Sequence, residues 1–326
     1  MKFDIRSPKT VNWLFAFFLV FNIITQLVIS VIFTFALGSE RIQGSLLQVQ
    51  IVSSIIAFGV PTVLYVVLSK KKLSEIFPSD MLDLPNVLFC TAISIFIQPA
   101  MMFLNVVSSA FANNDVSNFV TELSSTASPI MVFITIAVLP SILEELLFRG
   151  IILTGYSKVK LFAAALINGL FFGLMHLTLS QLLYAILVGA VLTVVVRYTK
   201  SIFASILIHF MINGSQVVLS YAFQNSTEVA EAAVETVSYL ESVVYAGMLF
   251  TLSMPFIMAL MYFFIKYNKK RLDAEADAAE EITPLVKPGE TTDKFVKPID
   301  PTFAIPVAIA AALIVLMTIA TNMLLG

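Results

Sequence analysis

Long apolar stretches separated by short polar segments dominate the chain. A helix needs ~20 mostly apolar residues to cross a bilayer, and nine stretches are close to or above that length. The predicted membrane-spanning segments are residues 11–37, 46–68, 87–111, 129–155, 161–179, 181–196, 201–223, 243–265 and 303–325. This pattern predicts an all-α polytopic membrane helix bundle of about nine transmembrane helices, an eight-helix core plus a C-terminal span.

Two segments in the first quarter of the chain need a closer reading. The first apolar run follows Lys2, Arg6 and Lys9, as in a secretory signal peptide. It is longer than the roughly 7–15 apolar residues of a signal peptide, so we expect a retained membrane helix. Residues 73–84 are short and amphipathic and are expected to lie at the membrane interface.

The distribution of basic residues predicts an orientation. The N-terminus and the turns near residues 70, 158, 198 and 270 hold nearly all the lysines and arginines, whereas the alternate loops hold only Arg41. Because cytoplasmic loops carry the excess of basic residues, the N-terminus is expected to be cytoplasmic. The loop pattern favours an integral protein of a bacterial plasma membrane.

The overall composition narrows the function classes. Hydrophobic residues make up 59% of the chain and charged residues only 12%, against about 25% charged in soluble domains. There is no Gly-rich phosphate loop and no basic patch interleaved with aromatic residues, so nucleic acid is not an expected partner. The single cysteine, Cys90, rules out an internal disulfide and is expected to be a small buried apolar residue.

The fourth apolar segment contains an unusual charged cluster. Glu144, Glu145 and Arg149 lie within six positions, although each charge at the centre of a membrane helix costs about 2.5–3.5 kcal/mol on insertion scales. Glu145 and Arg149 are four residues apart and share a helix face, while Glu144 lies about 100° further round. We therefore expect Arg149 to neutralise Glu145 and Glu144 to point elsewhere. Pro140 removes one backbone hydrogen bond and can bend the helix near this cluster.

Both histidines of the chain also lie in predicted spans. His176 follows Phe172 by one helical turn, and Asn213 follows His209 by one turn. A lone histidine in a membrane helix is as often a packing residue as a functional one. Two histidines, an asparagine and a glutamate pair on three helices are more typical of one shared polar site.

These side chains suit the hydrolysis of an amide. A carboxylate beside an imidazole is the general-base arrangement for activating water, and a second imidazole with a carboxamide can hold an oxyanion. No serine or cysteine has a base beside it, so direct attack by water is favoured. Alternatively, Glu144, His176 and His209 could bind zinc. The His-Glu-x-x-His motif is absent, however, so no metal is firmly predicted and zinc stays an open alternative.

Three motifs carry a resemblance to a known family. Glu144-Glu145-x-x-x-Arg149, Phe172-x-x-x-His176 and His209-x-x-x-Asn213 are similar, in this order, to the signature motifs of the CAAX protease and bacteriocin-processing (CPBP, or Abi) family. That family includes the type II CAAX prenyl endopeptidases. The resemblance covers about residues 129–215.

The resemblance implies an intramembrane endopeptidase acting on a membrane-associated protein or peptide. It implies that Glu144 and His176 activate water and that His209 and Asn213 stabilise the oxyanion. Glu145, Arg149 and Phe172 would support the site structurally. Members are often described as metalloproteases, although a metal-independent glutamate mechanism suits these residues better.

Five units are expected along the chain. They are 1–128, with N-terminal helices 1–3; 129–223, the catalytic core of helices 4–7; 224–266, an outer loop and helix 8; 267–302, a flexible cytoplasmic linker; and 303–326, a C-terminal transmembrane helix. The linker is predicted because its sequence is charged, proline-containing and poor in aromatic residues.

Two other function classes remain open at this point. A non-catalytic bacteriocin-immunity or signalling protein on the same scaffold would work without an active Glu144. A proton-coupled transporter could use intramembrane Glu and His as a proton relay, but no inverted repeat is visible. Oligomeric state and substrate identity are not set by the sequence.

Overall fold

The computed structural model describes residues 7–38, 45–111, 120, 123, 127–224, 238–282 and 299–325. Apart from one isolated β-bridge between Ser79 and Ser201, the regular structure in these ranges is helical, which confirms the predicted fold class. The elements are α1 (Pro8–Leu37), α2 (Leu46–Ser69), α3 (Leu73–Ile76), α4 (Leu84–Phe96), α5 (Gln98–Ser108), α7 (Pro129–Phe133), η3 (Ile134–Val138), α8 (Leu139–Glu145), η4 (Leu146–Ile152), α9 (Leu153–Gly155), α10 (Leu161–Met175), α11 (Leu179–Thr199), α12 (Ile202–Gln224), α14 (Tyr239–Ile282), η5 (Pro301–Phe303) and α15 (Ala304–Leu325).

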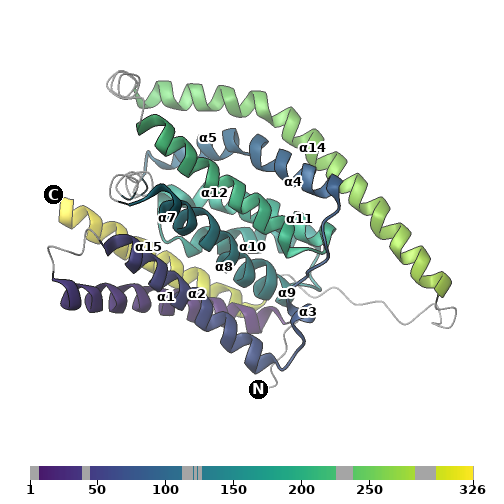
Figure 1. Ribbon diagram of the computed structural model, residues 1–326, viewed down its shortest axis with the longest axis horizontal. Helices are drawn as coiled ribbons and strands as arrows, with labels where there is room; N and C mark the ends of the chain where they lie inside the picture. Colours follow the sequence, from purple (N-terminus) through teal and green to yellow (C-terminus); the bar gives the residue numbers. More distant parts are fainter. Residues whose placement is uncertain are drawn as a thin grey trace.

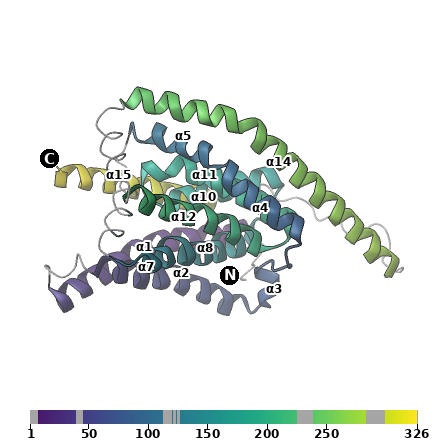
Figure 2. The same ribbon diagram turned by 45° about the horizontal axis from the view of Figure 1, so that its top comes forward.

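The helices form three groups (Figures 1 and 2). Helices α1, α2 and α15 lie on one side, and α4, α5 and α14 on the other. Between them lie α10, α11, α12 and the segment from α7 to α9. The core joins the first group to the middle one through aromatic side chains, for example Phe15 of α1 stacked on Phe171 of α10 at 4.4 Å between ring centroids. The middle group is therefore enclosed on two sides by apolar helices.

The number of full-length spans differs from the prediction. Within the described ranges, eight helices are long and apolar enough to cross a membrane, whereas nine spans were predicted. The exception is α10, which ends at Met175 after 15 residues. It ends early because Leu177 has a left-handed backbone, with φ of 56°, a conformation that cannot continue a right-handed helix. The turn thus falls directly after His176, which places this histidine at a helix end.

The predicted linker begins later than expected. Helix α14 continues to Ile282, so residues 267–282 are helical rather than part of a flexible segment; residues 283–298 lie outside the described part of the chain. Here the sequence is rich in Ala, Glu and Lys, which are strong helix formers. Arg271 also anchors the helix by donating to the carbonyl oxygens of Tyr198 and Thr199. The charge content of residues 267–282 alone therefore led to the wrong prediction of a flexible linker.

Polar contacts tie the outer helices to the middle group and to each other. Asn12 of α1 accepts a hydrogen bond from Tyr156 and donates one to Thr302. On the opposite side, Tyr267 of α14 donates to Asp83 at 2.7 Å. Partial burial raises the pKa of Asp83, but the hydrogen bonds from Tyr267 and Asn86 outweigh that effect and hold the pKa below its ordinary value of 3.8. Asp83 also caps α4 by accepting from the Asn86 backbone N–H, so this carboxylate contributes to how α4 is held against α14.

Candidate active site

The segment that carries both glutamates is helical from Pro129 to Gly155, and its α-helical winding is interrupted by two π-helical stretches. Two π-helical stretches, η3 and η4, flank the short α-helix α8, which ends at Glu145. Local π-helical geometry is frequently found at functional sites because it redirects side chains. Glu144 and Glu145 thus lie between two irregularities of one membrane helix.

One contact of Asn213 lies one turn before Pro140. In an α-helical register the N–H of residue 140 would donate to the Ile136 carbonyl, but a proline has no N–H. The Asn213 Nδ2 donates to that Ile136 oxygen at 3.0 Å. One N–H of the carboxamide therefore serves the fold, and the second N–H is left over for another acceptor.

Glu145 lies at the centre of a buried charge network. Its Oε1 accepts from Arg149 Nη1 at 2.9 Å and lies 2.9 Å from His209 Nδ1. The side chains of Glu145 and Arg149 are fully buried. The predicted Glu145–Arg149 pair is present, and His209 joins it from α12, a contact that the helical phase of one segment could not predict.

Arg149 and Phe172 hold the network against α10 and α11. The Arg149 guanidinium lies 4.4 Å from the Phe172 ring centroid, a cation–π distance, and its Nη2 donates to the Gly189 carbonyl at 3.1 Å. A Cβ at Gly189 would lie 2.8 Å from Gly169 Cα, so the glycine lets α11 pack closely against α10. The Phe172 ring also makes edge contacts with the rings of His176 and His209, at centroid distances of 5.3 and 5.7 Å.

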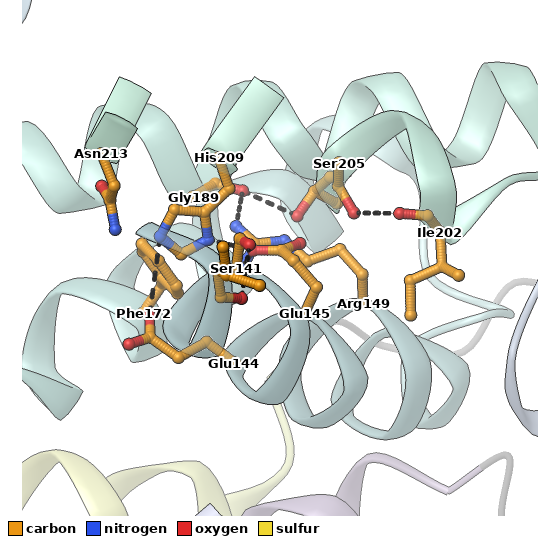
Figure 3. Close-up of polar contacts among 12 residues, drawn as sticks. Ser141, Glu144, Glu145, Arg149, Phe172, Gly189, Ile202, Ser205, His209 and Asn213 are labelled. Atoms are coloured by element: carbon orange, nitrogen blue, oxygen red, sulfur yellow. Dashed lines mark hydrogen bonds and ion pairs between the residues drawn. The ribbon is translucent and has the colours of Figure 1, made fainter. Parts of the chain in front are cut away.

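Glu144 borders this network without a hydrogen bond to it and faces His209. Its Oε2 lies 4.0 Å from His209 Nε2, which is too long for a hydrogen bond. The Glu144 side chain is 13% exposed, and its Oε2 has no hydrogen-bond partner among the described residues. Figure 3 shows His209 and Asn213 projecting from one helix toward the helix that carries the two glutamates. A carboxylate with a free oxygen therefore borders the imidazole.

Hydrogen bonds indicate which nitrogen of each imidazole carries a proton. His176 Nδ1 lies 2.8 Å from the Phe172 carbonyl oxygen, and His209 Nδ1 faces the Glu145 carboxylate. Both partners are acceptors, so both Nδ1 atoms are donors. In the neutral form, each Nε2 is then free to accept a proton.

The structure brings most of the predicted residues together, but His176 does not pair with Glu144 as expected. Glu144, Glu145, Arg149, Phe172 and His209 form a connected group. His176 reaches it through Phe172, and no hydrogen bond or ion pair between His176 and Glu144 is found in the described chain. The sequence reasoning missed the carbonyls of Gly189 and Ile136. Pro140 was a usable signal for the second of these, because it predicts a carbonyl without its helical donor.

The residues named for a zinc site do not form one. Among the described residues, no group of three or more His, Cys, Asp or Glu side chains is placed to hold a metal ion. Glu144, His176 and His209 as placed here therefore do not fit a metal ion.

Comparisons with known proteins converge on the same segment. Residues 126–215 match the family model "Rce1-like: Type II CAAX prenyl endopeptidase Rce1-like". The chain is also 35% identical over 109 residues to a Bacillus subtilis (strain 168) protein named "Putative membrane peptidase YdiL", over 31% of this chain and 44% of that protein. The match thus spans less than half of the relative's length. No solved structure matches the chain significantly.

The fold and the site define an integral, all-α membrane protein whose polar centre is built on α8, α10 and α12. Residues 126–215 are similar to the type II CAAX prenyl endopeptidases, which confirms the resemblance predicted from the three motifs.

Proposed function

We propose that this protein is an intramembrane endopeptidase that hydrolyses a peptide bond of a membrane-associated protein or peptide. The observation that carries the proposal is the Glu144 carboxylate, whose Oε2 has no hydrogen-bond partner in the described parts of the chain and lies 4.0 Å from the His209 imidazole. A carboxylate inside a membrane helix is costly, and a role as catalytic base accounts for its presence. The match of residues 126–215 to a family of endopeptidases supports this reaction class.

Glu144 acts as the general base in the proposed mechanism. It takes a proton from a water molecule whose oxygen attacks the carbonyl carbon of the scissile bond. The neutral Nε2 of His176 can accept a second hydrogen bond from that water and orient it. The same proton then passes from Glu144 to the leaving amine, which releases the two peptide products and restores the carboxylate.

His209 and Asn213 stabilise the oxyanion. The Asn213 N–H not used by Ile136 donates to the oxyanion. With Nδ1–H held by Glu145, His209 can donate from Nε2 only as the doubly protonated imidazolium. That cation would lie between the Glu144 and Glu145 carboxylates, and with Arg149 it would balance the two negative charges. Preorganised donors of this kind contribute about 10²–10³ in rate.

The setting of the reaction is part of the proposal. The eight apolar helices fit a substrate that lies in or at the bilayer. The basic loops favour a cytoplasmic N-terminus and a bacterial plasma membrane.

The test is cleavage of candidate membrane peptides by the purified full chain. Glu144→Gln removes the base but keeps the side-chain volume, so we expect at least a 100-fold loss of kcat. The matched control is Glu241→Gln, an exposed carboxylate at the start of α14, which should cleave like the unmodified protein. Circular dichroism and size-exclusion profiles should be the same for all three.

A second variant separates catalysis from a scaffold role. His209→Gln should lower kcat with little change in KM, since the oxyanion forms only in the transition state. Full cleavage by both Glu144→Gln and His209→Gln would refute the proposal. Complementation of a deletion strain by the Glu144→Gln protein would favour the non-catalytic alternative.

A further inference from the structure

A cavity lined by charged and polar side chains lies between α3, α9 and the end of α11. It has a volume of about 190 Å³ and is lined in part by Glu75, Arg149, Thr154, Ser157, Arg197 and Lys200. This is several times the ~30 Å³ that a water molecule occupies in the liquid. Three of these six side chains are cationic. The cavity lies toward the end of the bundle that carries the basic turns.

Three of the residues that line this cavity carry a buried donor atom for which no partner is found among the described residues. In the described part of the chain, Arg149 Nε, Arg197 Nε and Ser157 Oγ are buried without a hydrogen bond. Arg149 itself is fully buried. Buried donors are nearly always satisfied in folded proteins, so three of them on one cavity indicate a ligand that supplies acceptors. That ligand should be rich in oxygen atoms.

The fixed charge of the cavity indicates an anion. Arg197 donates to the carbonyl oxygens of Ser157 and Tyr156, and these neutral partners fix its guanidinium without neutralising it. Arg149 is balanced by Glu145. At the rim, Lys200 pairs with Glu275 at 3.2 Å and Glu75 with Lys71 at 3.6 Å. Both rim pairs are exposed and therefore weak, so the charge of Arg197 dominates.

We propose that this cavity binds a phosphate group, supplied either by a phosphomonoester lipid headgroup or by free inorganic phosphate. Arg149 Nε, Arg197 Nε and Ser157 Oγ donate to its oxygens, and Lys200 closes the site from the rim. Guanidinium groups suit phosphate because their donors are planar and permanently charged. Glu75 opposes binding and sets its strength. This site is independent of peptide hydrolysis, although Arg149 connects it to Glu145 and His209.

The first experiment is a phosphate titration of the full-length protein in neutral detergent, monitored by thermal unfolding and calorimetry. Sodium chloride of equal ionic strength is the reference. A second arm uses phosphatidylcholine nanodiscs with and without phosphatidic acid. A response to inorganic phosphate alone assigns the site to free phosphate, and a response to phosphatidic acid alone assigns it to a lipid headgroup. No response in either arm refutes the proposal.

Variants distinguish the cavity from a general basic surface. Ser157→Ala and Lys200→Gln remove groups that do not hold the fold, and each should weaken binding at least threefold. Lys270→Gln, an exposed cation at the same end of the bundle, is the matched control and should leave binding unchanged. Glu75→Gln should tighten binding, a gain that misfolding cannot mimic. Equal affinity in Ser157→Ala, Lys200→Gln and Lys270→Gln would overturn the assignment.

Discussion

Replacing Arg149 by Met tests the charge network most directly. The substitution keeps an apolar stem of similar length but leaves the fully buried Glu145 carboxylate without its guanidinium partner. Removing one partner of a buried ion pair costs about 3–5 kcal/mol, because the other charge stays buried and unpaired. We expect a loss of unfolding free energy in this range.

Other contacts of Arg149 change this figure little. The Gly189 carbonyl keeps a hydrogen bond from Thr193 Oγ1 at 2.9 Å, so losing Arg149 does not orphan it. The cation–π contact with Phe172 contributes up to about 2 kcal/mol when desolvated, and Met retains part of the packing against that ring. The buried Glu145, left with His209 as its partner, therefore dominates the cost.

A double-mutant cycle in mixed micelles isolates the pair. In Arg149→Met/Glu145→Gln both charges are gone, and the Gln oxygen can still accept from His209 Nδ1. The double variant should be more stable than Arg149→Met alone by at least about 2 kcal/mol. The matched control is Lys71→Met, which breaks an exposed i,i+4 pair and should cost less than about 1 kcal/mol. Additive losses in the cycle, or equal losses for Arg149→Met and Lys71→Met, would refute the reasoning.

Two further predictions concern single contacts. In the Pro140→Ala background, residue 140 regains an N–H that can donate to the Ile136 carbonyl. Asn213→Ala should therefore cost less stability there than in the unmodified protein. An equal cost in equilibrium unfolding would contradict the connection between Pro140 and the Asn213–Ile136 hydrogen bond. Asp83 has a lowered pKa in the folded state, so it stabilises the fold above its unfolded pKa and loses this contribution as the pH falls through the folded value. The stability difference between Asp83→Asn and the unmodified protein should therefore be largest at neutral pH and shrink below about pH 4, and a difference independent of pH would exclude the carboxylate as its source.

The sequence predicts the bounds of some helices more accurately than those of others. The fourth predicted span, 129–155, coincides with the helical segment Pro129–Gly155, since apolar length and flanking polar residues define its ends. By contrast, the span 161–179 was extended too far, because the left-handed backbone at Leu177 has no marker in an apolar run. The span 87–111 is divided at Ile97 into α4 and α5, where Pro99 removes a backbone donor.

The sequence by itself determined the bundle of apolar helices, the polar residues at its centre and the Glu145–Arg149 pair. Those features depend on hydropathy and on spacing within one helix, which repeats every 3.6 residues. Only the tertiary structure decided that His209 contacts Glu145 and borders Glu144, that Asn213 binds the Ile136 carbonyl, and that Gly189 accepts from Arg149. Contacts between helices depend on how the helices rotate and how closely they pack. That closeness is set by small residues such as Gly169 and Gly189, whose role becomes visible only when both helices are in place.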